Sequence, residues 1–151
     1  MSLYVILKFL HVALAIVAVG FNASYPIWFR LAQREPQAAL VILRGIKTLD
    51  DRIANPAYAL LLVLGLAMAF TAGIPLTTFW IAAALVLYLL LVLTALIGYT
   101  PTLKKQIAAL GSGGTRSEEY VRLSQRSNAI GIVLMLYVIV ILFLMVVKPT
   151  L

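Results

Sequence analysis

The chain contains no cysteine and a single histidine, His11. The absence of cysteine excludes disulfides, thiolate metal sites and thiol nucleophiles. A single histidine excludes three-histidine zinc sites and, within one copy, a haem held by two histidines. Charge is also scarce, because only 11% of the residues are charged and only five of them are acidic.

Apolar residues make up 64% of the 151 residues, whereas a soluble domain is about half apolar and about a quarter charged. They are gathered in four runs, and about 20 residues suffice for a helix to cross a bilayer. The runs cover residues 4–29, 54–73, 78–99 and 129–147. Each must be a helix, because a lone strand in lipid leaves its backbone groups unpaired. The sequence therefore predicts an all-α, four-transmembrane-helix bundle that uses residues 1–151 as one domain in the lipid bilayer.

Lysine and arginine are distributed unevenly along the chain. Ten of the twelve follow the first or the third run, and the short turn at residues 74–77 has none. The positive-inside rule then places both termini outside and both basic segments in the cytoplasm. The net charge of +7 is assigned to this topology and to anionic lipid, and no nucleic acid partner is expected.

The first basic segment has a helical repeat of its own. Its apolar residues recur at i, i+4, i+7 and i+11, at Ile42, Ile46, Leu49 and Ile53. Arg44 and Lys47 fall on another face. The pattern predicts an amphipathic cytoplasmic helix between helices 1 and 2, lying in the headgroup layer, with a break at Asn55-Pro56 before the second span.

The second basic segment is interrupted by the glycine-rich stretch 111–114, which indicates a flexible break. Thr115 followed by Glu118 resembles a capping box. The fourth helix is therefore predicted to begin near Arg116 in water and to run into the membrane.

Small residues on the second span, Gly65, Ala69 and Gly73, are spaced by four. Such a stripe lets two helices approach closely in lipid, although it also arises by chance in spans rich in alanine and glycine.

Five polar residues have simple structural interpretations. Asn22 and Thr94 lie at similar depth, where an interhelical hydrogen bond is the default. Tyr88 lies in mid-span, and its hydroxyl is expected to donate to a backbone carbonyl. Asp50 and Asp51 are expected to form surface ion pairs, with Lys47 four residues before Asp51.

His11 is the candidate for chemistry inside a span, because ionisable residues there are functional candidates by default. It lies roughly 9 Å deep and Met68 on the second span roughly 7–8 Å deep, at 1.5 Å per residue. Histidine and methionine are a known pair of axial haem ligands, so haem b is the cofactor considered, with His11 as its metal ligand. Met145 lies nearer the surface. The alternative is a neutral histidine that packs between helices, with the methionines as apolar packing residues.

Lys8 lies one turn before His11 and shares its face. Its ammonium could hold a haem propionate, or it could simply anchor the helix at the outer surface. No carboxylate lies inside any of the four runs and no internal repeat is apparent, and both observations argue against a proton-coupled transporter.

Three stretches together resemble known families: residues 7–11 (Leu-Lys-Phe-Leu-His), residues 55–57 (Asn-Pro-Ala) and residues 146–149 (Val-Val-Lys-Pro). Their order and topology are similar to those of HemJ-type protoporphyrinogen oxidases, which are four-helix proteins of bacterial inner membranes. They also resemble a related "domain of unknown function" family of predicted integral membrane proteins. This second family is the closer match, notably at residues 126–128 (Arg-Ser-Asn). Either resemblance implies a multi-pass protein of the bacterial inner membrane.

The chain departs from the oxidase pattern at several positions. The stretch after His11 lacks that family's tryptophan, and the third span lacks its early lysine and its terminal Tyr-His pair, ending at Tyr99-Thr100. Of the residues that the oxidase family uses for its function, only His11 and Lys8 have counterparts in this chain. Three hypotheses follow: an accessory protein that binds a membrane protein partner or a second copy, a b-type haem or tetrapyrrole protein built on His11, and the oxidase itself. The sequence does not decide whether the protein is an enzyme.

Overall fold

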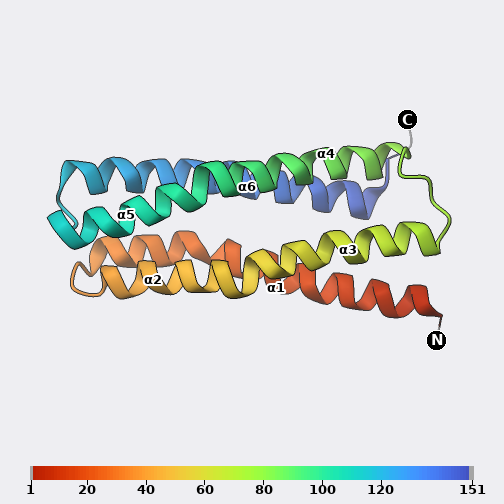
Figure 1. Ribbon diagram of the computed structural model, residues 1–151, viewed down its shortest axis with the longest axis horizontal. Helices are drawn as coiled ribbons and strands as arrows, with labels where there is room; N and C mark the ends of the chain where they lie inside the picture. The colour runs from red at the N-terminus through yellow and green to blue at the C-terminus, as the bar shows by residue number, and fades with distance from the viewer. Residues whose placement is uncertain (1, 150–151) are drawn as a thin grey trace.

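The structure, a computed structural model, describes residues 2–149 as an all-helical protein (Figure 1). Four continuous helical rods are long and apolar enough to cross a membrane: Leu3–Arg34, Ala39–Thr71, Phe79–Gly113 and Glu118–Val147. The predicted all-helical fold class, with four helices able to cross a membrane, is confirmed. At 1.5 Å per residue, 30 to 35 residues extend roughly 45–52 Å, well beyond the roughly 30 Å hydrocarbon core. Each rod therefore has a membrane half and a basic half.

Two of the rods contain a π-helical segment. The first and fourth rods are single α-helices, α1 (Leu3–Arg34) and α6 (Glu118–Val147). The second rod consists of α2 (Ala39–Leu49), η1 (Asp50–Ala54) and α3 (Asn55–Thr71). The third consists of α4 (Phe79–Leu93), η2 (Thr94–Tyr99) and α5 (Thr100–Gly113).

Short turns join the rods, and glycine or serine sets their ends. Gly73 and Gly114 adopt positive φ angles of 65° and 73° after α3 and α5, a conformation that glycine reaches without a steric penalty. Ser117 caps α6, because its hydroxyl accepts a hydrogen bond of 3.3 Å from the Tyr120 amide. The cap is thus Ser117 and not Thr115, and the helix begins two residues later than predicted.

The interfacial helix expected in the first basic segment is not confirmed. A helix is present at α2, but it packs against α1 and α5 and continues through η1 into α3 without a break at Pro56. Its buried residues are Ala39, Leu43 and Ile46. The helix therefore buries part of its apolar face against other helices and belongs to a continuous rod, so it is not a separate surface helix.

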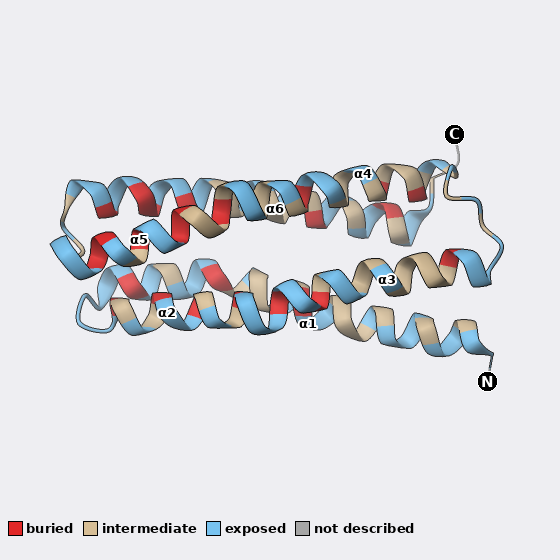
Figure 2. Cartoon of the chain, in the orientation of Figure 1, coloured by how far each residue is buried: buried red, intermediate tan, exposed pale blue. Residues whose placement is uncertain are grey.

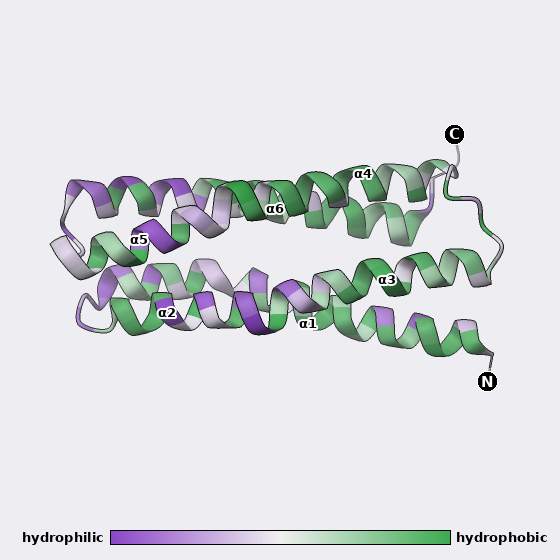
Figure 3. Cartoon of the chain, in the orientation of Figure 1, coloured by the Kyte–Doolittle hydropathy of each residue, from purple (hydrophilic) through white to green (hydrophobic). Residues whose placement is uncertain are grey.

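The rods form two hairpins, in which α1 packs along α3 and α4 packs along α6. In the membrane halves no Cα atom of α3 comes within 8 Å of one of α4. The hairpins meet instead through α2 and α5 and through α1 and α6. The main cluster of buried apolar residues is made largely by the basic halves, including Leu43, Leu103 and Leu123. Figure 2 shows most buried positions at the end away from the termini, and Figure 3 shows that this end is the more hydrophilic one.

Candidate functional site

A pocket of about 400 Å³ lies between the two hairpins, where their membrane halves give way to the packed basic halves. Every rod contributes to its lining. The walls are largely apolar, and the polar residues among them are Asn22, Tyr25, Asp50, Asn55, Tyr58, Tyr88, Tyr99, Ser127 and Asn128. Apart from Asp50, none of the lining residues carries a charge.

Irregular backbone surrounds this pocket on three rods. The π-helical segment η1 begins with Asp50 and η2 ends with Tyr99, and both residues line the pocket. On α1, Pro26 lies inside the helix and has no amide hydrogen to donate to the Asn22 carbonyl. Single π turns often mark functional sites in helices. Here they direct the Asp50 carboxylate and the Tyr99 phenol toward the same cavity.

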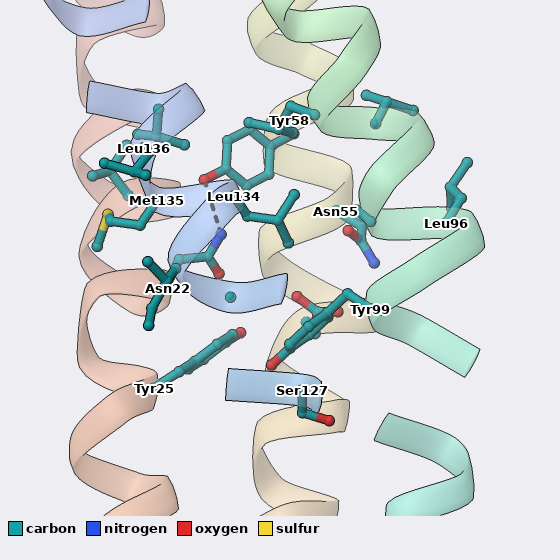
Figure 4. A pocket seen from close by; sticks show the side chains of 18 of the residues that line it. Asn22, Tyr25, Asn55, Tyr58, Leu96, Tyr99, Ser127, Leu134, Met135 and Leu136 are labelled. Carbon is teal, nitrogen blue, oxygen red and sulfur yellow. Dashed lines mark hydrogen bonds between the residues drawn. The ribbon is translucent and has the colours of Figure 1, made fainter. Parts of the chain in front are cut away.

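Two hydrogen bonds organise the upper part of the pocket, and Tyr58 takes part in both. The Asn22 side-chain amide donates to the Tyr58 hydroxyl at 2.9 Å (Figure 4). The Tyr88 hydroxyl donates to the Tyr58 backbone carbonyl at 2.9 Å. Tyr88 thereby joins α4 to α3 although the two backbones stay apart, and its predicted bond to a carbonyl is confirmed. Asn22 bonds Tyr58 and not Thr94, so that predicted pair is wrong.

Several buried polar atoms of the pocket lack a hydrogen-bond partner. They are the Asn22 side-chain oxygen, the Tyr25 and Tyr99 hydroxyls and the Ser127 hydroxyl. Figure 4 shows the Tyr25 and Tyr99 hydroxyls pointing toward each other from opposite sides of the pocket. Each unsatisfied buried group costs about 1–3 kcal/mol. A cavity that gathers four of them is built to receive polar groups from another molecule or from water.

Asp50 is buried, with 7% of its surface exposed. Its carboxylate lies near the Tyr25 hydroxyl and the Asn55 amide. Asp51, the next residue, is exposed and pairs with Lys47. The predicted surface ion pair is therefore confirmed for Asp51 and wrong for Asp50, which has no ion-pair partner among residues 2–149.

The three residues proposed from the sequence as a cofactor site lie elsewhere. The His11 ring packs against Gly65 in the contact between α1 and α3, and an added Cβ at Gly65 would lie 3.3 Å from its Cε1 atom. Its Nδ1 atom is buried and without a hydrogen-bond partner. Met68, one turn after Gly65, is half-buried, and Lys8 is exposed. None of these three residues lines the pocket, and haem ligation by His11 and Met68 stays a prediction.

The signal that could have revealed Asp50 was present in the sequence. The buried stripe of α2 runs Ala39, Leu43, Ile46 and then Asp50, which is also a repeat of i, i+4, i+7 and i+11. The stripe predicted from the sequence begins at Ile42 and has the same spacing, but it shares only Ile46 with the buried stripe. A carboxylate in register with a buried apolar stripe indicates a polar site within the core.

The fold and the pocket define a class of protein: a four-span integral membrane protein with a largely apolar cavity, bordered by a few polar groups, between two helical hairpins. The sequence matches the family described as predicted integral membrane protein (DUF2269) over residues 5–149. The chain belongs to this family, which confirms the second of the two resemblances. Neither the curated proteins nor the solved structures include a significant match. The relationship to HemJ-type oxidases stays a prediction.

Proposed function

We propose that this protein binds a small amphiphilic molecule within the bilayer, in the pocket between its hairpins. The observation that carries the proposal is the set of four unpartnered polar atoms that border one largely apolar cavity. Ligand pockets are typically about 300–1,000 Å³ in volume, mostly apolar, with a few polar groups that orient the ligand. The apolar walls suit a hydrocarbon body, and the polar atoms suit a hydrogen-bonding head.

A route into the pocket follows from how the hairpins are joined. Because α3 and α4 do not approach each other closely, the membrane halves can admit a lipid-soluble molecule from the side. The packed basic halves close the opposite end with buried leucines, including Leu43 and Leu103. The ligand is therefore expected to enter from the bilayer and not from the cytoplasm.

Gly131 provides a direct test, since it lines the pocket and a Cβ added there would meet nothing within 4 Å. Gly131→Leu should place a branched side chain in the pocket, and its Cβ has open space. Gly20→Leu is the matched control, because Gly20 also faces open space but does not line the pocket. The measurement is saturable binding of 1-octanol to protein in uncharged detergent, followed by native mass spectrometry. Wild type and Gly20→Leu should bind one octanol and Gly131→Leu none, whereas unchanged binding by Gly131→Leu would refute the site.

Haem binding by His11 is the second candidate: its Nδ1 atom is buried without a hydrogen bond of good geometry, although the ring lies near the Leu61 backbone. Because the ring occupies the contact with Gly65, a haem there requires α1 and α3 to part. The absorption spectrum of protein in mild detergent tests this candidate. A Soret band that shifts on reduction and is lost in His11→Ala would support haem, with Met68 as the other ligand. A spectrum without that band would leave His11 as a packing residue.

Binding of a membrane protein partner, or of a second copy, through the lipid-facing surfaces is the role proposed from the sequence. An accessory function of this kind is compatible with a pocket, because a bound amphiphile can change how the two hairpins pack against each other. Location in a bacterial inner membrane belongs to the same proposal.

A further inference from the structure

The charge inside the pocket restricts what its ligand can be. Asp50 is the one charged residue that lines the pocket, and it lies in a chain that otherwise carries an excess of positive charge. A buried carboxylate is costly unless a cation or hydrogen bonds compensate it. The ten cytoplasmic-side Lys and Arg residues would be plentiful partners, yet none of them forms an ion pair with Asp50.

The groups that face Asp50 come from all the elements packed around it. Tyr25 approaches from α1 and Tyr99 from η2, and Asp51 is its neighbour within η1. Lys47 lies one turn earlier on α2, but its ammonium is engaged by Asp51. Among residues 2–149 the surroundings of Asp50 therefore supply phenol groups, the Asn55 amide and a second carboxylate, and no free cation.

The unpartnered atoms of the pocket accept hydrogen bonds. The Asn22 amide group already donates to Tyr58, so only its carbonyl oxygen remains free. The hydroxyl oxygens of Tyr25, Tyr99 and Ser127 can accept as well as donate. An alkylammonium group has three donors and a positive charge, and tyrosine rings attract cations through their faces. The pocket thus complements a cationic donor and opposes an anionic head.

We propose that the ligand is an amphiphilic amine, whose protonated head pairs with Asp50 and donates to the Asn22 oxygen and the neighbouring phenol oxygens, while its hydrocarbon body fills the apolar walls. This inference rests on the proposed function and names its ligand class. A bare metal ion fits the site less well, because no group of three or more His, Cys, Asp or Glu occurs among the described residues and about 400 Å³ far exceeds one ion.

The experiment compares octylamine with 1-octanol, which has the same chain and an uncharged head. An alkylamine is charged at neutral pH, as lysine is with a pKa of about 10.4. Wild-type protein in uncharged detergent should bind octylamine about tenfold or more tightly than octanol, as expected for a charge-assisted hydrogen bond. Equal affinities in the wild type would overturn the inference, and this comparison needs no variant.

Variants assign the preference to one carboxylate. Asp50→Asn should bind the two probes equally while still binding octanol, which verifies that the pocket is intact. Glu35→Gln is the matched control and should keep the preference, because Glu35 is exposed, lies outside the pocket lining and does not pair with Lys47. A preference that survives in Asp50→Asn would overturn the inference. If Gly131→Leu fails to block octanol, the proposed function itself fails, and the two failures are distinguishable.

Discussion

His11 and Gly65 illustrate how single residues set the distance between helices. The imidazole occupies the space that a side chain at Gly65 would need, with 3.3 Å between Cε1 and an added Cβ. Ala69, one turn further along α3, is also buried. The small-residue stripe predicted from the sequence is therefore used at these two positions, whereas Gly73 serves the turn after α3.

Gly65→Leu is expected to destabilise the protein by about 1–3 kcal/mol, because the new side chain must displace the His11 ring or push α1 away from α3. The midpoint of thermal unfolding in mild detergent measures the loss. Gly20→Leu should leave the midpoint unchanged or raise it, since leucine favours helix more than glycine does. A fall of equal size in both variants would mean that the α1–α3 contact is not the cause.

Polar residues in the spans were predicted with uneven success, and the reason is geometric. Depth along a helix follows from counting residues at 1.5 Å each, so groups that share a level can be identified. Which neighbour a side chain faces depends on helix rotation and packing. Asn22 therefore bonds Tyr58 and not Thr94, because depth alone does not determine which neighbour it faces. The prediction for Tyr88 required only a backbone carbonyl at the same depth, and the Tyr58 carbonyl meets that requirement.

At the scale of elements, the packing of α2 distinguishes two arrangements of the first basic segment: a helix inside the bundle, or a helix on the membrane surface. Leu43 is fully buried, while Val41, two residues earlier, is 74% exposed. Leu43→Ala should cost about 2–5 kcal/mol, as is typical of leucine truncation in a core. Val41→Ala, the control, should cost little because its side chain makes few contacts.

Unfolding by heat or denaturant in mild detergent measures both variants. If the two truncations have similar small effects, α2 does not pack against α1 and α5, and the interfacial helix predicted from the sequence is restored. Nitroxide labels at positions 42 and 44 provide a second readout, because Ile42 is half-buried and Arg44 is exposed.

At the scale of the whole molecule, the helical rods form a membrane half in which each hairpin packs within itself, and a basic half that holds most of the buried apolar core. Both ends of the described chain lie at the apolar end of the bundle (Figure 1). At that end the Lys148 ammonium lies 5.4 Å from the centre of the Trp80 ring. Aromatic residues and snorkelling lysines are typical of the membrane surface.

We expect both termini to be outside, since ten of the twelve Lys and Arg residues belong to the opposite end, which the positive-inside rule assigns to the cytoplasm. Periplasmic and cytoplasmic reporters fused to each terminus measure this orientation. Both fusions should report a periplasmic location, and cytoplasmic activity at either terminus would contradict the prediction.

The sequence by itself determined the number of spans, the all-helical class and the position of the basic segments. These features follow from the length of apolar runs and from the need to satisfy every backbone group in lipid. These are local properties of each segment, so they can be predicted without knowing which helices lie beside it.

Only the tertiary structure decided which faces meet and where a cavity remains. Lipid is as apolar as leucine, so hydrophobicity does not mark the inner face of a span. The pocket depends on the π-helical turns that place Asp50 and Tyr99, and on two hairpins whose backbones pack closely through α2 and α5 and through α1 and α6 but not through α3 and α4. Its residues come from four rods far apart in the chain, and their convergence is a property of packing that no single segment encodes.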